Sequence, residues 1–249
     1  MPKRNKTYGL IGKTLGHSFS QKYFSQKFKA QGSSETYENF ELENIQLFPE
    51  LIASRRDLCG LNVTIPYKES IIPFLDELSE EARAIGAVNT IKIEGEKLIG
   101  FNTDAFGFHQ SIKPFLRGDC HRALILGTGG ASKAVAYVLN NLGIDCFFIS
   151  RNPEGERQYS YDDINEIMVS SMGLIVNATP LGTHPNVEEG PAFPFHFLST
   201  KHHVVDLIYN PEKTKFLKQA AIHGASIQNG YQMLIHQAER AYRIWTMNQ

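Results

Sequence analysis

The sequence predicts an α/β protein with two domains, each built around its own sheet. Short apolar or β-branched runs alternate with longer amphipathic stretches from end to end, as in chains of βα units. A hairpin-like turn gives the first half some antiparallel character, whereas the alternation becomes more regular from about Arg122. The length of 249 residues suits one large domain or two modest ones.

The first half is expected to form a mixed-sheet α/β domain. A strand at the start is followed by a glycine and serine loop and by a helix with Tyr23, Phe24 and Phe28 at core spacing. The segment 94–97 has the composition of a hairpin turn. The expected strands of this half are 7–11, 61–63 and 87–91.

The second half is expected to form a doubly wound, largely parallel sheet. Its expected strands are 123–126, 145–149, 174–176, 204–207 and a last one near 225–227, with helices at 131–142 and after Thr214. A final amphipathic helix carries one apolar stripe, made of Tyr231, Leu234, Ala238, Ala241, Tyr242 and Trp245. We expect residues 1–103 with 230–249 to form one domain and residues 104–229 the other, with an active site in the cleft between them.

Composition excludes several classes of protein. A net charge of −1 gives no basic footprint for nucleic acid or an anionic membrane surface, and 11% aromatic residues argue against disorder. No apolar run approaches the roughly 20 residues of a membrane span. The three cysteines are widely spaced and form no Cys-x-x-Cys pair, and no histidines have the spacing of a helical zinc site, so we expect no metal. The basic start shows no signal-peptide core, and we expect a cytoplasmic protein. The choice between monomer and homodimer stays open.

A glycine turn follows the first strand of the second half and opens a helix. This is the context of a dinucleotide-binding fingerprint, in which glycines and a helix N-terminus let the backbone approach a pyrophosphate. The expected contacts are Gly127, Gly129, Gly130 and Ala131. Ser132 stands where the fingerprint has its third glycine, and a tight βα turn without a ligand is the alternative.

The end of the next strand indicates which dinucleotide is bound. NAD-binding domains usually place an acidic residue about 20 positions after the glycines. Ser150 followed by Arg151 stands here, and a guanidinium pairs with a 2′-phosphate. We therefore expect a Rossmann-like domain that binds NADP(H), the alternative being that Arg151 is a solvated surface residue.

Polar segments at expected strand ends mark the first half as the carbonyl-handling domain. Ser18 and Ser20 could direct hydroxyls at a ligand or merely cap the next helix. Reduction of a ketone by hydride needs a cation and a proton source at the developing alkoxide. Lys68 with Asp104 is the candidate pair, although a surface lysine and an N-cap aspartate would show the same spacing.

Together these segments resemble the shikimate dehydrogenase family in order along nearly the whole chain. In the first half the resemblance lies in 8–12, His17-Ser18-Phe19-Ser20, 62–68, 86–90 and 100–104, with Gln21 where the family commonly has proline. It implies that Lys68 and Asp104 are the catalytic pair. It also implies that the substrate is held by Ser18, Ser20, Thr64, Asn89, Tyr209 and Gln237.

The resemblance continues through 127–132, 177–182, 206–211 and 229–237. It implies that Thr179 lies beside the nicotinamide ribose and Gly230 near the nicotinamide, adding these two residues to the cofactor contacts Ser150 and Arg151. Thr183 replaces a frequent methionine. Glu154 stands where NADP-using members often have a second arginine, which implies a weaker hold on the 2′-phosphate.

The resemblance implies reversible, NADPH-dependent reduction of 3-dehydroshikimate to shikimate, on the route to chorismate and aromatic amino acids. Two alternatives remain. One is an NAD-preferring quinate/shikimate dehydrogenase paralogue, against which the absence of an acid at Ser150 argues. The other is a non-catalytic NADP-binding sensor, which would be expected to have lost Lys68, Asp104 or a substrate hydroxyl.

Overall fold

The computed structural model describes residues 6–16, 18–116 and 118–247, so His17 lies outside the described residues. The chain divides into two compact units, residues 1–103 with 238–249 and residues 104–237. Both crossings fall near or within helices, namely α4 (Thr103–Ile112) and α8 (Tyr231–Thr246). The return to the first unit, expected at residue 230, comes at residue 238, inside α8.

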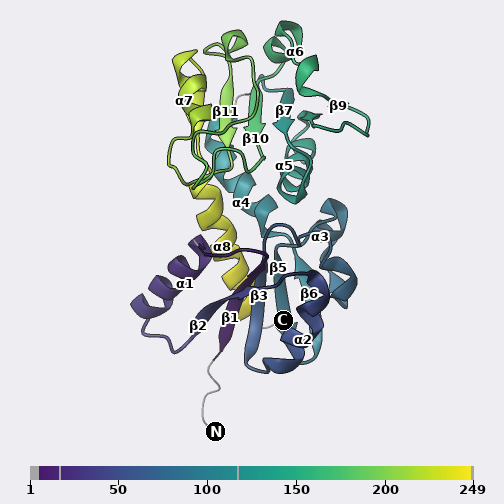
Figure 1. Cartoon of the computed structure of the whole chain (residues 1–249), viewed down its shortest axis with the longest axis vertical. Helices are drawn as coiled ribbons and strands as arrows, with labels where there is room; N and C mark the ends of the chain where they lie inside the picture. The colour runs from purple at the N-terminus through teal and green to yellow at the C-terminus, as the bar shows by residue number, and fades with distance from the viewer. Residues whose placement is uncertain (1–5, 17, 117, 248–249) are drawn as a thin grey trace. The chain divides into compact units, whose positions relative to one another are not determined.

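The first unit is a six-stranded mixed sheet with helices (Figure 1). The strand order is β2-β1-β3-β5-β6-β4, in which β1 is parallel to β2 and β3 while β5 is antiparallel to β3 and β6. The strands are β1 (Thr7–Gly12), β2 (Thr36–Glu41), β3 (Leu58–Val63), β4 (Glu77–Leu78), β5 (Thr90–Glu94) and β6 (Lys97–Phe101). The helices are α1 (Phe19–Ala30), α2 (Phe48–Ser54) and α3 (Glu80–Ile85). The predicted mixed α/β class of this half is confirmed.

Helices cover both faces of this sheet because side chains alternate along β1. Tyr8 points into a cluster with Phe24 of α1 and Trp245 of α8, and the Tyr8 and Trp245 rings stack at 4.8 Å. Ile11 faces the opposite cluster, with Phe48 of α2. The Trp245 indole N–H donates to the carbonyl oxygen of Ile91 at 2.9 Å, which fixes the end of α8 to the sheet.

Two expectations for this half differ from the structure. The strand expected from residue 87 begins at Thr90, because residues 87–89 bond to three neighbouring segments instead of one strand. Tyr231, expected in the apolar stripe of the last helix, is 45% exposed. The first turns of α8 pack on α4 instead, where a Cβ on Gly107 would lie 2.6 Å from the Met233 carbonyl oxygen.

The second unit is a six-stranded sheet in which all pairs are parallel. Its order, β12-β11-β10-β7-β8-β9, reads 6-5-4-1-2-3 when numbered from β7, which is the order of the doubly wound dinucleotide-binding fold. The strands are β7 (Arg122–Leu126), β8 (Asp145–Ile149), β9 (Gln158–Tyr159), β10 (Leu174–Asn177), β11 (His203–Asp206) and β12 (Ser226–Gln228). The further helices are α5 (Gly130–Asn141), α6 (Glu166–Ser170) and α7 (Lys215–Ile222). The predicted Rossmann-like class is confirmed.

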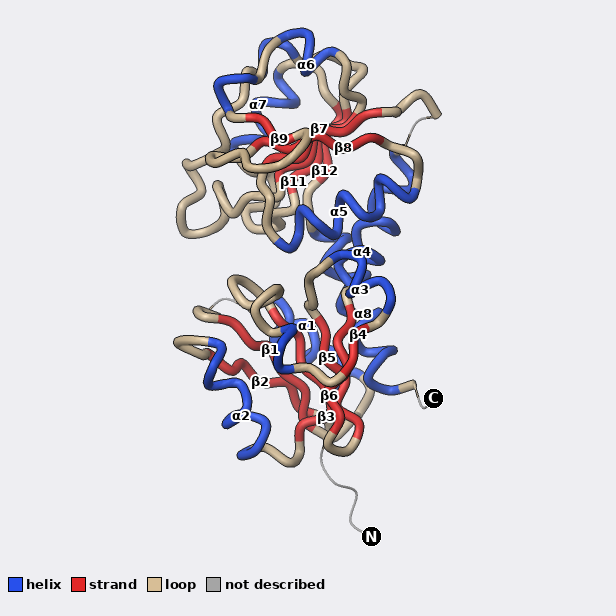
Figure 2. Tube along the Cα trace, turned by 90° about the vertical axis from the view of Figure 1, so that its right-hand side faces the viewer, coloured by secondary structure: helices blue, strands red, loops and turns tan. Residues whose placement is uncertain are grey.

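Helices also lie on both sides of the second sheet, with α5 on one side and α6 and α7 on the other (Figure 2). Leu124 of β7 and Ile175 of β10 pack with Val169 of α6 and Phe216 of α7 in one buried cluster. The strands therefore read as near-continuous apolar runs, since a parallel sheet is buried on both faces. Asn177 and Asp206 are buried polar residues at the carboxyl ends of β10 and β11.

Candidate active site

One edge of the first sheet gathers most of the predicted substrate residues. The carboxyl ends of β1 and β3 are in register there, as Ile11 pairs with Val63. The antiparallel strand β5 starts at the same edge, because Thr90 pairs with Asn62 and with Phe101 at the end of β6. The segments that leave or enter this edge carry Ser18, Ser20, Thr64, Lys68, Asn89 and the start of α4.

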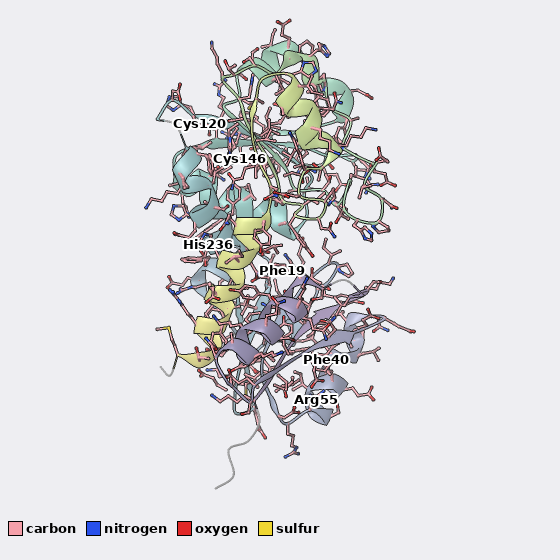
Figure 3. All side chains as sticks on the ribbon, turned by 90° about the vertical axis from the view of Figure 1, so that its left-hand side faces the viewer. Phe19, Phe40, Arg55, Cys120, Cys146 and His236 are labelled. Atoms are coloured by element: carbon pink, nitrogen blue, oxygen red, sulfur yellow. The ribbon has the colours of Figure 1, made fainter. Side chains whose placement is uncertain are left out.

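The serine loop after β1 places its two hydroxyls on the first turn of α1. Ser18 is the N-cap, and its oxygen accepts from the Gln21 backbone N–H at 3.2 Å. This cap uses an oxygen lone pair and leaves the hydroxyl proton to be donated, so capping and substrate binding are compatible. Phe19, which lies between the serines and is labelled in Figure 3, stacks on Tyr23 with the ring centroids 5.4 Å apart.

A buried hydrogen-bond network fixes the orientation of Asn89, which is 3% exposed. The backbone N–H of Thr103 can only donate, and it donates to Asn89 Oδ1 at 2.7 Å. The hydroxyls of Thr103 and Thr90 reach the same oxygen, both at 3.1 Å. Three donors therefore hold the amide oxygen toward the protein and set the side on which its NH₂ group lies.

The network continues from Asn89 toward β2 through Asn62. Asn62 Nδ2 donates to the Asn89 carbonyl oxygen at 3.2 Å, and Asn62 Oδ1 accepts from the Tyr37 hydroxyl at 2.8 Å. Burial raises the pKa of Tyr37, and a side-chain hydrogen bond with Ser20 partly offsets this rise. Ser20 and Asn89 are thus linked through buried polar groups behind the edge of the sheet.

Lys68 and the start of α4 are held by the same short segment, residues 87–89. The Lys68 carbonyl oxygen accepts from Val88 N–H at 2.7 Å, and Asn102 Nδ2 donates to the Ala87 carbonyl oxygen at 2.9 Å. Asp104, the second residue of α4, follows Thr103 and is 6% exposed. Asp104 is therefore not the N-cap that the alternative interpretation assumed, since it lies inside the first turn, where a carboxylate complements the helix dipole.

In the second unit, the glycine turn between β7 and α5 offers an open helix N-terminus. Gly127 has φ +104°, which favours glycine, and its N–H donates to the Ile149 carbonyl oxygen at 2.8 Å. Gly129 is the N-cap without a side-chain cap bond, and a Cβ there would meet nothing within 4 Å. Gly130 and Ala131 begin the helix. Backbone N–H groups at an uncapped helix start with open space in front suit a phosphate, so these residues fit a dinucleotide.

Ser132 departs from the fingerprint in a way the structure explains in part. Its side chain is fully buried, and its hydroxyl has no hydrogen-bond partner within the described residues. The third fingerprint position is where the helix packs closely on its strand, so the residue belongs to the packing of α5 on the sheet.

The Ser150–Arg151 pair follows the carboxyl end of β8. Ser150 Oγ accepts from Asn152 N–H at 3.2 Å and donates to the Asn152 carbonyl oxygen at 3.0 Å, which closes a small turn and leaves the Arg151 side chain exposed. Arg157, the next arginine along the chain, pairs with Asp145 at 2.9 Å, at the amino end of β8. The guanidinium at the carboxyl end of β8 is therefore that of Arg151.

Two buried polar residues end the neighbouring strands β10 and β11. Asn177 Oδ1 accepts from the N–H and the hydroxyl of Thr179 at 3.0 and 2.7 Å, and Asn177 Nδ2 donates to Asp206 Oδ1 at 3.0 Å. Asp206 also accepts from the Ile208 backbone N–H at 3.1 Å and from the Thr214 hydroxyl at 2.6 Å. Burial raises the pKa of Asp206 to about 6, although these hydrogen bonds lower it.

This raised pKa predicts how stability depends on pH. Between about pH 4 and 6 the folded chain holds a proton on Asp206 that the unfolded chain has lost, so rising pH favours unfolding. Asp206→Asn cannot titrate. Relative to that variant, the wild type should lose about 2 kcal/mol of unfolding free energy between about pH 4 and about pH 7. Urea unfolding at both pH values measures the difference, and parallel stabilities of the two proteins would contradict it.

The remaining predicted residues belong to the second unit. Gly230 N–H donates to the Ile208 carbonyl oxygen at 3.0 Å, which puts it beside the turn after β11. Tyr209 lies on that turn and is half-buried. Gln237 of α8 is buried, with Nε2 donating to the Leu234 carbonyl oxygen at 3.0 Å. Tyr209 and Gln237, like the catalytic candidate Asp104, are thus grouped with the nucleotide residues, whereas the other predicted substrate residues belong to the first unit.

Tyr37, Asn62, Thr90, Asn177, Asp206 and Thr214 were not assigned a role from the sequence. A signal was present for two of them, because Asn177 and Asp206 each end a run of apolar residues that reads as a buried strand. A buried polar group at such a place needs hydrogen-bond partners, which marks it as part of a network. Across residues 6–16, 18–116 and 118–247, no group of three potential ligands could hold a metal ion.

No described helix is both long and apolar enough to cross a membrane.

Comparison with known proteins agrees with this arrangement. The model of the shikimate dehydrogenase substrate binding domain matches residues 10–91. Shikimate dehydrogenase (NADP(+)) of Caldicellulosiruptor saccharolyticus is 39% identical over 253 residues, covering 95% of this chain and 90% of that protein.

Solved structures match across both units. Shikimate 5-dehydrogenase from Thermus thermophilus, in complex with NADP(H) and shikimate, has a TM-score of 0.84 and 33% identity, covering 97% of this chain and 93% of that one. Quinate dehydrogenase from Corynebacterium glutamicum, in complex with NAD, has a TM-score of 0.85 and 29% identity, covering 97% and 94%. With these similarities extending over nearly its whole length, this chain belongs to the shikimate dehydrogenase family.

Proposed function

We propose that this protein catalyses the reversible NADPH-dependent reduction of 3-dehydroshikimate to shikimate, a step toward chorismate and the aromatic amino acids. One observation carries the proposal: residues 87–89 hold both the Lys68 backbone and the segment that leads into Asp104. The relatives named above supply the substrate and cofactor classes, since one is a shikimate dehydrogenase in complex with NADP(H) and shikimate.

The chain's own residues provide the acid chemistry of this reaction. NADPH, when bound, supplies the hydride that adds to the ring carbonyl. Lys68 donates a proton to the carbonyl oxygen as negative charge develops there, and solvent then reprotonates its amine. Asp104 orients the Lys68 ammonium. Ser18, Ser20, Thr64, Asn89, Tyr209 and Gln237 hold the carboxylate and hydroxyls of the substrate.

Asn89 has a defined part in this recognition. Because three protein donors occupy its amide oxygen, the group it presents on the other side is the NH₂, which donates to substrate oxygens. The fixed orientation favours a ligand with an acceptor at that position. Recognition of a hydroxyl-bearing ring by such pre-oriented groups discriminates strongly against analogues without the matching oxygen.

The cofactor is held by three groups of residues in the second unit. Gly127, Gly129, Gly130 and Ala131 bind the pyrophosphate with backbone N–H groups, and Thr179 and Gly230 line the nicotinamide end. Ser150 and Arg151 take the adenosine 2′-phosphate. The proposed location is the cytoplasm, whose reducing conditions suit the three free cysteines, of which Cys120 and Cys146 are labelled in Figure 3.

Arg151→Ala is expected to raise KM for NADP⁺ by roughly 10- to 100-fold and to leave KM for NAD⁺ unchanged, because a hydrogen bond to a charged group contributes about 1.5–3 kcal/mol. Steady-state kinetics with both cofactors measures the change. Arg157→Ala is the matched control, since its guanidinium pairs with Asp145. An equal effect on both cofactors would show that Arg151 does not read the phosphate.

A spectrophotometric assay of shikimate and quinate, each with NADP⁺ and NAD⁺, tests the proposed function. The expected result is that only the combination of shikimate with NADP⁺ gives reduction of the cofactor. Preference for NAD⁺ or equal use of quinate would favour a quinate/shikimate dehydrogenase. No reduction in any of the four combinations, with NADP⁺ binding intact, would favour a sensor without catalysis.

A further inference from the structure

Asp206 is fully buried at the carboxyl end of β11 and joins three segments by hydrogen bonds. One oxygen receives Asn177 Nδ2 from β10 and the backbone N–H of Ile208, and the other receives the hydroxyl of Thr214. A buried carboxylate is costly unless it is hydrogen-bonded in this way. No role has been assigned to Asp206 in the reaction above.

The first arm leads through Asn177 to the glycine turn. Asn177 Oδ1 accepts from both the N–H and the hydroxyl of Thr179, so the Thr179 side chain is held in one orientation. A Cβ on Gly127 would lie 3.2 Å from Thr179 Cγ2, which shows how closely the threonine packs on that turn. Ala178 N–H also donates to the Leu126 carbonyl oxygen at 3.0 Å, which ties the same loop to the end of β7.

The second arm leads through Ile208 to Gly230. Asp206 fixes the Ile208 N–H, and the Ile208 carbonyl oxygen accepts from Gly230 N–H at 3.0 Å. A Cβ on Gly230 would overlap the Leu207 carbonyl oxygen, so the two backbones lie in close contact. Leu207 N–H is held in turn by the Asn177 carbonyl oxygen at 3.0 Å, so both arms meet in one rigid group of strand ends.

The third arm leads away from the predicted cofactor residues. The Thr214 hydroxyl donates to Asp206 and accepts from Leu217 N–H at 3.2 Å, as the N-cap of α7. Loss of such a cap costs about 1 kcal/mol of stability. Among the described residues, the Thr214 hydroxyl bonds Asp206 and Leu217 and does not bond β10 or the loop after it. Thr214 therefore provides a control for any purely structural effect of Asp206.

We propose that Asp206 is a positioning residue for the cofactor, acting through Asn177 on Thr179 and the Gly127 turn and through Ile208 on Gly230. It touches neither cofactor nor substrate. The proposal rests on the proposed function for the identity of the cofactor. Its physical basis is that one carboxylate fixes the ends of β10 and β11, and β10 borders the switch point between β7 and β10, where ligands bind in this fold.

The test compares five variants by calorimetric titration with NADP⁺ and by thermal unfolding. Asp206→Ala and Asn177→Ala should each weaken NADP⁺ binding at least tenfold. The double variant should bind NADP⁺ about as weakly as the more affected single variant, because the two residues act through the same series of hydrogen bonds. Asp206→Asn should stay within about threefold of wild type, since its amide oxygen still accepts from Asn177 and Ile208. Thr214→Ala should lower the unfolding temperature and leave the Kd unchanged.

Several results would overturn the proposal. Wild-type affinity in Asn177→Ala does so even if Asp206→Ala fails to fold, because Asn177→Ala leaves Asp206 in place. Equal loss of affinity in Thr214→Ala would show a general effect on stability. If the wild type binds NADP⁺ but oxidises no shikimate, only the proposed function is excluded. If the wild type is active and the variants bind NADP⁺ with wild-type affinity, only the positioning role is excluded. If the wild type binds no NADP⁺, both are excluded.

Discussion

Lys68→Ala is expected to lower turnover in 3-dehydroshikimate reduction by about 10²- to 10⁴-fold, the range that a positioned general acid contributes. The Lys68 backbone is bonded to Val88 through its carbonyl group, which alanine retains, so the edge of the sheet keeps its structure. Cofactor affinity should stay unchanged, because the predicted cofactor residues belong to the other unit. Steady-state rates, NADP⁺ titration and thermal unfolding together measure these effects.

Lys97→Ala is the matched control for this experiment. Lys97 belongs to the same unit and forms an exposed ion pair with Glu77 at 2.6 Å, so its removal changes the charge equally without affecting the proposed acid. We expect its turnover to equal that of the wild type. Near-normal turnover in a well-folded Lys68→Ala variant would exclude Lys68 as the acid.

Gly230→Ala is expected to weaken NADP⁺ binding at least tenfold and to lower the free energy of unfolding by about 1–3 kcal/mol, as overpacking does. The added Cβ would overlap the Leu207 carbonyl oxygen. This backbone cannot move aside easily, because Leu207 N–H and Ile208 N–H are both hydrogen-bonded, to Asn177 and to Asp206. Titration with NADP⁺ and urea unfolding measure the two effects.

Gly190→Ala serves as the control for the glycine substitution. Gly190 is in the same unit, and a Cβ there would meet nothing within 4 Å. Affinity and stability should both stay at wild-type values. If Gly230→Ala also bound NADP⁺ normally, the Gly230 segment would not contribute to the cofactor site.

The fold was predictable where one segment's own pattern decided its structure. The parallel strands of the second unit are apolar runs bounded by turns, and β8 has the predicted bounds. The strand β2 was not predicted, because its polar sequence, TYENFE, lies at an edge of the sheet and is only partly buried. Thr90 begins β5 three residues later than expected, because residues 87–89 bond to segments distant in sequence, which local periodicity does not reveal.

The site residues also divide into those that local sequence reveals and those that it does not. The glycine turn could be recognised because its spacing is local and its physics is that of a helix start. The network behind it could not, since Asn177 and Asp206 are 29 residues apart and meet only because β10 and β11 are paired in register. Tyr37 and Asn62 likewise meet across 25 residues of sequence. A polar residue at the end of a buried strand indicates that it has hydrogen-bond partners, but the order of the strands in the sheet determines which residues those partners are.

The position of Trp245 has a consequence for folding during synthesis. Its ring completes the cluster around Tyr8 and Phe24, yet the ribosome makes it only after all of residues 104–237. At about 5–20 residues per second, the first unit waits on the order of ten seconds for the segment that covers this aromatic face. The second unit ends at residue 237, only eight residues before Trp245, so the two units are completed almost together. Until Trp245 is made, the aromatic face around Tyr8 and Phe24 lacks its cover, and we expect chaperones to bind the nascent chain there.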